Sequence, residues 1–198
     1  MTMQMEQRAF ELNELRVSRD DKQPPRIVGH AAVFNTLADG GRFREKVAPG
    51  AFAESINADD VRALFNHDSN IVLGRNRAGT LRLKEDERGL SIEIDPPATQ
   101  AARDLIVSLE RGDISQMSFG FETLKDSWEK SDDESKTDIR TLLKVRLWEV
   151  SPVVFPFYKQ TDVAVRSHET WKKTLTEPEP TWITIPNLRR RLKLAQVR

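Results

Sequence analysis

The sequence predicts an α+β protein that is mainly β, with a closed or partly closed β-barrel and flanking helices. Three observations predict this class. At 80–95, apolar and polar residues alternate on both sides of a charged turn that ends in Gly89, a pattern typical of a β-hairpin. Strand-like apolar patterns recur at 26–34, 60–66, 114–124 and 139–150. Helical spacing is clear at 99–111, where an apolar stripe ends before the stop signal Gly112.

The remaining elements have weaker signals. The run 8–17 is strand-like, but its apolar residues change parity near Asn13, so we expect a β-bulge there. A Pro-Gly pair opens a short helix over 49–56. The charged stretch 128–138 has the composition of a solvated loop between two strands.

The character of the chain changes after Val165. The sequence EPEP at 177–180 is typical of a linker, and the segment 188–198 is basic and weakly amphipathic, as in a solvated helix. We therefore predict one domain over 1–165. A linker and a basic tail follow over 166–198.

Composition excludes several classes of function. The 198 residues include 31 Lys and Arg against 31 Asp and Glu, so the net charge is zero and favours neither nucleic acid nor membrane as the main partner. Cysteine is absent, which excludes disulfides, thiolate metal sites and a cysteine nucleophile. No His, Asp and Glu cluster has metal-ligand spacing, and no apolar window approaches the roughly 18 residues of a membrane helix. We expect a soluble intracellular protein without metal or other cofactor.

Ser118 is a candidate nucleophile. One face of the strand 114–124 carries the large apolar side chains of Met117, Phe119 and Phe121. If that face packs into the core, the Ser118 hydroxyl faces outward beside Gly120, which leaves room for an extended substrate to lie close. The alternative is an ordinary polar strand residue.

His67 is the candidate base. It ends a row of same-parity residues on the strand 60–66, where the sheet is expected to meet solvent. The alternative is a hydrogen-bonded histidine at a sheet edge, without a catalytic role. His30 lies in the middle of the apolar run 26–34 and is expected to be a satisfied core or edge residue.

Glu149 is the candidate orienting carboxylate. It shares a strand face with Val145 and Leu147, so it extends an apolar row and needs a partner that compensates for lost hydration. An imidazolium is a suitable partner. The alternative is a different partner, such as Arg146 or Arg140. Asp68 adjoins His67 in the chain but projects to the opposite face, so it is the weaker candidate for orienting the ring.

Several motifs occur along the chain in a characteristic order. They are GHAAVFN (29–35), PGAF (49–52), VRALFNHD (61–68), LGR (73–75) with GTLRL (79–83), GLSIEID (89–95), GDISQMSFGF (112–121) and WEVSPVVFP (148–156). In this order they resemble the prohead protease family of tailed bacteriophages, over residues 8–165. The tail beyond Val165 lies outside that resemblance and is expected to be either a segment removed by self-cleavage or a segment that targets the protein to the capsid.

The resemblance implies a serine endopeptidase distantly similar in fold to the herpesvirus assemblins, whose β-barrel is ringed by helices. It places the histidine of the NHD motif on His67, the serine of MSFGF on Ser118 and the acidic residue of EVSPV on Glu149. It also implies the partners: the major capsid protein, whose scaffolding segment is cut inside the prohead in the host cytoplasm, and the protease itself, through self-processing and as a homo-oligomer.

Two other classes of function stay open at the level of sequence. A non-catalytic capsid-assembly factor could keep the fold without the activity. A nucleic-acid-binding module could use the basic residues 189–191, although a solvated helix face is the better explanation of them. Specific nucleic-acid binding is not expected, because the net charge is zero and the tail has few aromatic residues.

Overall fold

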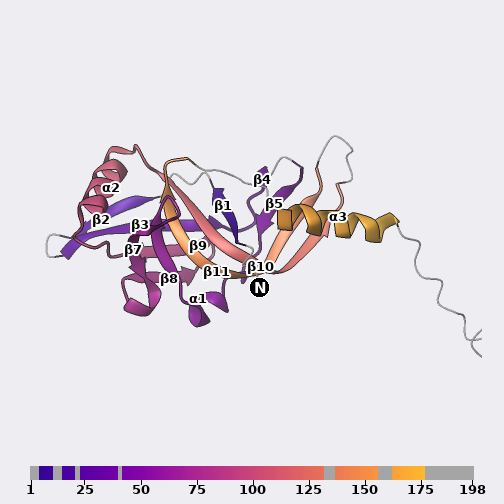
Figure 1. Ribbon diagram of the computed structural model, residues 1–198, viewed down its shortest axis with the longest axis horizontal. Coiled ribbons are helices and arrows are strands. Elements are labelled where there is room, and N and C mark those ends of the chain that lie inside the picture. The colour runs from indigo at the N-terminus through magenta and orange to yellow at the C-terminus, as the bar shows by residue number, and fades with distance from the viewer. Residues whose placement is uncertain are drawn as a thin grey trace, which may run out of the picture. The chain divides into compact units, whose positions relative to one another are not determined.

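A computed structural model of the chain describes residues 5–10, 15–20, 23–39, 42–131, 137–155 and 162–176 (Figure 1). The chain divides into two compact units, Met1–Thr161 and Asp162–Arg198. The second unit contains the helix α3, Asp162–Thr176. The predicted linker at 177–180 and the predicted helix at 188–198 lie outside the described residues. No helix in the described part is both long and apolar enough to cross a membrane.

The first unit contains two β-sheets. The larger sheet has seven strands, with the path β1 (Glu6–Phe10), β10 (Gln116–Glu129), β11 (Ile139–Val153), β5 (Arg44–Val47) and β4 (Ala38–Asp39). Off this path, β6 (Arg62–Phe65) pairs with β11, and β7 (Asp68–Arg75) pairs with β6. The smaller sheet has the order β2 (Arg16–Asp20), β3 (Gln23–Val33), β9 (Gly89–Ile94) and β8 (Leu81–Glu85). The helical elements of this unit are α1 (Ser55–Ala58), η1 (Asn76–Ala78) and α2 (Gln100–Arg111).

The mainly β fold class is therefore confirmed. The predicted β-barrel is not confirmed, because neither sheet closes on itself among the described strands. Both sheets instead contribute apolar side chains to one buried cluster, which α2 also joins. Burial of these side chains is the main stabilising force available to such a unit. Large members of the cluster are Ile27, Phe52, Leu90, Ile94, Phe119, Phe121 and Leu147.

The hairpin and the main helix form where the sequence predicts them. β8 and β9 pair antiparallel across the turn that ends at Gly89, as their period-2 pattern requires. In α2, the Thr99 hydroxyl accepts a hydrogen bond from the backbone N–H of Ala102, which caps the helix N-terminus. Gly112 ends the helix with φ of 78°, a left-handed conformation that glycine adopts without steric cost.

The interpretation of 8–17 as one bulged strand was wrong. β1 pairs with β10 in the larger sheet, whereas β2 pairs with β3 in the smaller sheet. The parity change seen near Asn13 thus marks two strands that belong to different sheets. Their buried faces are set independently, so no common alternation links them.

Candidate active site

β10 positions Ser118 as its sequence pattern predicts. The side chains of Met117, Phe119 and Phe121 are fully buried in the core, and the Phe119 and Phe121 ring centroids lie 5.0 Å apart. Ser118 belongs to the opposite face of this strand. That face is not open to solvent, however, because Ser118 is only 1% exposed. The expectation that its hydroxyl faces outward was therefore wrong.

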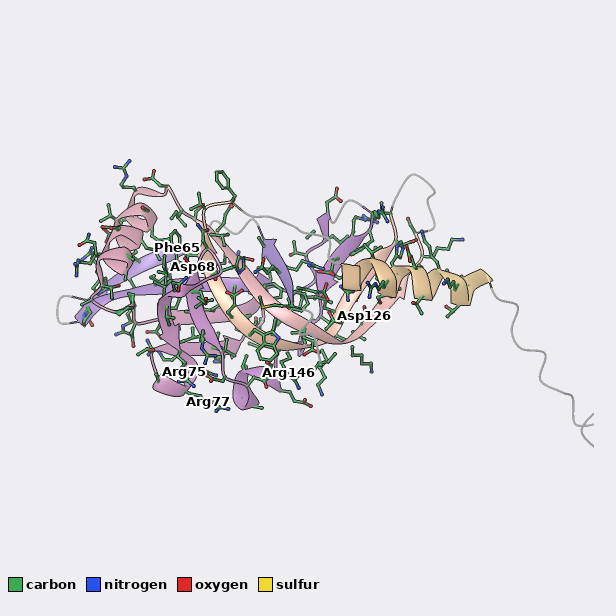
Figure 2. All side chains as sticks on the ribbon, viewed as in Figure 1. Phe65, Asp68, Arg75, Arg77, Asp126 and Arg146 are labelled. Atoms are coloured by element: carbon green, nitrogen blue, oxygen red, sulfur yellow. The ribbon has the colours of Figure 1, made fainter. Side chains whose placement is uncertain are left out.

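His67 lies in the two-residue turn between β6 and β7, rather than at the end of a strand. Asn66 and His67 have φ of 52° and 61°, as in the tight hairpin turns whose twist matches that of the paired strands. The flanking residues Phe65 and Asp68 pair with each other, and Arg75 lies at the far end of the hairpin (Figure 2). Few residues other than glycine adopt this left-handed region, and asparagine and histidine are among those that are enriched in it.

Hydrogen bonds tie the turn to the end of β11. The Asn66 backbone N–H donates to the Pro152 carbonyl at 3.0 Å, and the Asn66 side-chain oxygen accepts from the Val154 backbone N–H at 3.0 Å. The His67 backbone N–H donates to the Ser151 hydroxyl at 3.3 Å. These contacts hold the histidine in its unusual backbone conformation.

Glu149 reaches His67 because β11 contains a β-bulge. Ser151 lies opposite Ser118 and Glu149 lies opposite Gly120, but Leu147 lies opposite Phe121. The register shift between Gly120 and Phe121 breaks the alternation that would otherwise put Glu149 in the apolar row with Leu147. The carboxylate instead lies over Gly120, where an added Cβ would be 3.2 Å from both Cδ and Cγ of Glu149. The room that Gly120 provides is taken by this side chain.

The Glu149 carboxylate is buried and has two partners. Its Oε1 lies 2.6 Å from Nδ1 of His67, and its Oε2 accepts a hydrogen bond of 2.5 Å from the Ser151 hydroxyl. The Glu149 side chain is 6% exposed and that of His67 is 19% exposed. The alternative partners of the carboxylate are engaged elsewhere, Arg140 with Asp126 and Arg146 with Glu122. A buried carboxylate needs such compensation.

The structure thus brings two of the three predicted side chains into contact and places the third on the neighbouring strand. Ser118 shares a face with Glu149 and Ser151, but its hydroxyl donates to the Arg8 carbonyl of β1 at 2.9 Å. No hydrogen bond joins Ser118 to His67 among the described residues. Asp68, the weaker candidate, accepts hydrogen bonds from Asn70.

Sequence reasoning missed Ser151 and Arg8. Ser151 follows Glu149 by two residues, so strand periodicity alone could have placed both on one face. Nothing in the pattern of the chain signals that the backbone of Arg8 meets the Ser118 hydroxyl, because that contact depends on how β1 pairs with β10.

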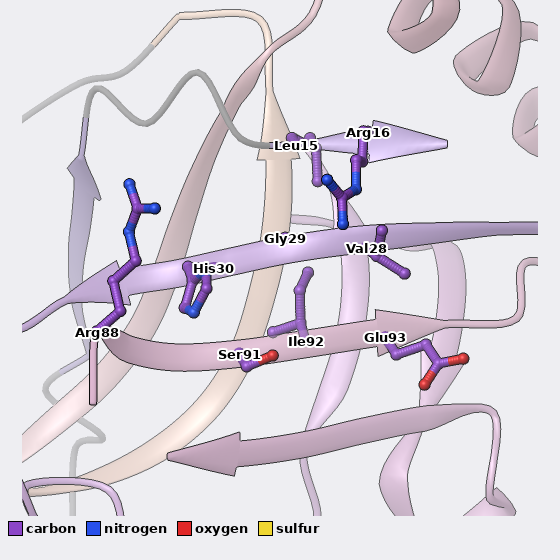
Figure 3. Close-up of a pocket in the computed structure, with 9 residues that line it drawn as sticks. All are labelled: Leu15, Arg16, Val28, Gly29, His30, Arg88, Ser91, Ile92 and Glu93. Carbon is purple, nitrogen blue, oxygen red and sulfur yellow. The ribbon is translucent and has the colours of Figure 1, made fainter. Parts of the chain in front are cut away.

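His30 belongs to a different part of the molecule. Figure 3 shows the hollow of about 510 Å³ that it lines together with Arg16 and Ser91; none of Ser118, His67 and Glu149 lines it. His30 Nε2 lies 2.9 Å from an Asp86 carboxylate oxygen, so the histidine has a partner, as its position in the apolar run suggested. In the described part of the chain, no group of three or more His, Cys, Asp or Glu side chains could hold a metal ion.

The chemistry of the arrangement follows from the two ring nitrogens of His67. With the Glu149 carboxylate on Nδ1, the ring orientation is fixed and Nε2 remains to exchange a proton with a reacting group. A carboxylate–imidazole pair with a serine on the adjacent strand is the side-chain set of a serine hydrolase.

The comparisons with known proteins give the family within that class. The family model of the caudovirus prohead serine proteases matches residues 13–174, and the chain belongs to this family. The match extends past Val165, where the resemblance was expected to end. The chain is 30% identical over 124 residues to the prohead protease of Enterobacteria phage HK97. That alignment covers 61% of this chain and 52% of the HK97 protein, so the chain spans about half the length of this relative. No solved structure matches.

Proposed function

We propose that the protein is a serine endopeptidase of phage capsid maturation, with Ser118 as nucleophile, His67 as general base and Glu149 as the orienting carboxylate. The observation that carries this proposal is the 2.6 Å contact between His67 Nδ1 and Glu149 Oε1, beside a serine on the paired strand. Membership of the prohead serine protease family supports the same reaction class.

The proposed mechanism begins with a rotation of the Ser118 side chain. The hydroxyl leaves the Arg8 carbonyl and turns to Nε2 of His67 by moving to another of its staggered positions. Oγ then attacks a peptide carbonyl carbon while Nε2 takes its proton, and the C–N bond breaks as that proton passes to the leaving amine. Water, deprotonated in turn by His67, hydrolyses the resulting ester. Glu149 stabilises the protonated ring in both half-reactions.

The proposed substrates follow from the family. We infer that the enzyme cuts the scaffolding segment from the major capsid protein inside the prohead, in the host cytoplasm, and that it also cuts itself. Self-processing would remove the segment beyond the 1–165 domain. The capsid protein and a second copy of this chain are then its partners, and neither a membrane nor a specific nucleic acid is required.

The nucleophile assignment is tested by co-expression with the cognate capsid protein. Ser118→Ala is expected to leave the capsid protein uncut, whereas Ser18→Ala, which changes an exposed serine of β2, is expected to leave cleavage normal. Fragments are sized by mass spectrometry. Normal cleavage by the Ser118 variant would end the assignment.

A second candidate function is a non-catalytic capsid-assembly factor. The burial of Ser118 favours this second function. Its side chain is 1% exposed and its hydroxyl is hydrogen-bonded to a backbone carbonyl, so it cannot attack a substrate in this conformation. A serine-reactive phosphonate distinguishes the two functions. Mass increase at Ser118 supports the peptidase, and uncut capsid protein in the presence of the wild-type chain supports the assembly factor.

A further inference from the structure

The backbone of β1 lies where a peptide substrate of Ser118 would have to lie. Ala9 is directly opposite Ser118 in the antiparallel β1–β10 pair, and the carbonyl of the preceding residue, Arg8, accepts the Ser118 hydroxyl at 2.9 Å. A substrate must bring a peptide carbonyl carbon to the hydroxyl oxygen of Ser118. Extended peptides commonly bind by adding a strand to a sheet edge, as β1 does here.

β1 is also placed so that it could leave without breaking the sheet. It is the end strand of the larger sheet and pairs with β10 over five residues. Its departure would free the β10 edge from Met117 to Phe121, which includes Ser118. The other edge of β10 would keep its pairing with β11, and with it the contact between His67 and Glu149.

The two buried charges of β1 are opposite in sign and bind each other. Glu6 and Arg8 are fully buried and bind each other at 2.7 Å, so together they carry no net charge. Arg8 also binds Glu45 at 2.6 Å, and Glu6 binds Arg140 at 3.0 Å. Buried charges that lose their partners are costly.

The charged residues that would stay behind have partners of their own. Arg140 binds Glu45 at 3.0 Å and Asp126 at 2.7 Å. Loss of β1 therefore removes one positive and one negative charge. Arg140 keeps its ion pairs with Glu45 and Asp126. The vacated edge would present Glu45 to a basic side chain and Arg140 to an acidic one.

We infer that the β10 edge at 117–121 is a binding site for an extended peptide, and that β1 is its resident occupant. The preferred peptide carries a basic residue at the position of Arg8, read by Glu45, and an acidic residue two positions earlier, read by Arg140. The carbonyl of the basic residue meets Ser118. This inference rests on the proposed function, because it takes Ser118 as the nucleophile, and it makes β1 a self-inhibiting strand.

The test separates β1 from the body within the full chain. A recognition sequence for a site-specific protease is inserted between Phe10 and Leu15, and the control carries the same insertion at 132–136, between β10 and β11. After cutting, excess fluorescent peptide of residues 1–14 is added, and its exchange into the protein is followed by anisotropy. A second peptide, in which residues 6 and 8 are exchanged, has the same composition. Phosphonate labelling of Ser118 is measured in parallel, and circular dichroism monitors the fold.

The expected result has three parts. The peptide of residues 1–14 binds the cut protein, and the peptide with exchanged residues binds at least about tenfold more weakly, since it puts like charges opposite Glu45 and Arg140. After the fragment is dialysed away, Ser118 is labelled at least about tenfold faster, as expected if β1 occupies the site more than about 90% of the time. Peptide 1–14 restores slow labelling. The cut control binds no peptide and labels slowly.

The inference is overturned if the fragment never exchanges, if the fold is lost when it leaves, or if Ser118 is labelled equally fast with and without it. It is also overturned if both peptides bind equally well. Failure of the proposed function gives a different result: peptide 1–14 binds selectively, but Ser118 is labelled in no form of the protein. That result supports the peptide-binding site on the β10 edge and excludes Ser118 as the nucleophile.

Discussion

Replacement of Gly120 by alanine is the most specific perturbation of the candidate site, because it adds a single methyl group beneath the Glu149 carboxylate. The new Cβ would lie 3.2 Å from both Cδ and Cγ of Glu149 and would overlap Oε1, the oxygen that binds His67. The neighbouring atoms belong to a side chain rather than to backbone. The carboxylate must therefore move while the strand stays in place.

The size of the effect follows from these distances. Ordinary van der Waals contact requires roughly 3.5–4.0 Å between the new Cβ and Oε1 of Glu149. Because these two atoms would overlap, Oε1 must move by about 1 Å. The bond from Oε1 to Nδ1 is 2.6 Å, and such a displacement stretches it past the range of a strong hydrogen bond. Misplacement of a catalytic group by about 1 Å can cost roughly 100-fold in rate, or about 2.7 kcal/mol in the activation barrier. We also expect a loss of about 1–3 kcal/mol in the free energy of unfolding from overpacking.

The assay is the rate constant for phosphonate labelling of Ser118, with capsid-protein cleavage as a second readout. Gly120→Ala is expected to lower the rate about 100-fold in the wild-type background. On a Glu149→Gln background the same change is expected to cost less than about threefold, because no carboxylate remains to be misplaced. Equal losses on both backgrounds would refute the reasoning, since Gly120 would then act on the rate without Glu149.

Three further predictions concern the buried polar groups. Glu149→Gln keeps the volume of the side chain but cannot stabilise a protonated His67, so capsid-protein cleavage is expected to slow by about 10²–10⁴-fold with the circular dichroism spectrum unchanged; wild-type kinetics would contradict this. Ser151→Ala removes the donor to the Glu149 carboxylate and is expected to lower the free energy of unfolding by about 1–3 kcal/mol in urea titrations, with Ser18→Ala unchanged as control. Burial raises the pKa of Glu6, but the charges of Arg140 and Arg8 outweigh burial and hold that pKa below its ordinary value. A depressed carboxyl pKa stabilises the folded state above the ordinary value of about 4.3, and this stabilisation is lost as the pH falls through the lower folded-state value. As the pH falls from 7 to below about 4, the hydrogen-exchange protection of the β1 amides is therefore expected to decrease by more than that of the β9 amides, and equal decreases would count against the role of this charge.

The elements that could be predicted from the sequence are those with local signals. The hairpin of β8 and β9 and the helix α2 follow from alternation, a capping threonine and a terminating glycine, all of which act within a few residues. The aromatic face of β10 is set by period 2 alone. The assignment of strands to sheets depends on contacts between distant segments, which explains why one expected strand proved to be β1 and β2 in two different sheets.

The candidate site could be predicted only as a set of residue types. His67 was expected to end a strand, but a two-residue turn with positive φ holds it, and no periodicity predicts such a turn when its second residue is histidine. Ser118 was expected to face solvent because its strand has one apolar face. The sequence does not show that β1 covers the other face through a backbone contact.

The β-bulge in β11 explains how one strand serves both the core and the site. With strict alternation, Leu147 and Glu149 would share a face, and either the leucine would leave the core or the carboxylate would enter it. The register shift leaves Trp148 without a direct partner on β10, so Leu147 stays opposite Phe121 while Glu149 comes opposite Gly120. The carboxylate then gains His67 and Ser151 as partners instead of a place in an apolar row. A chain with the same side chains but a regular β11 would keep its hydrophobic pattern and lose the pairing of Glu149 with His67, so the extra residue in the strand is part of the site.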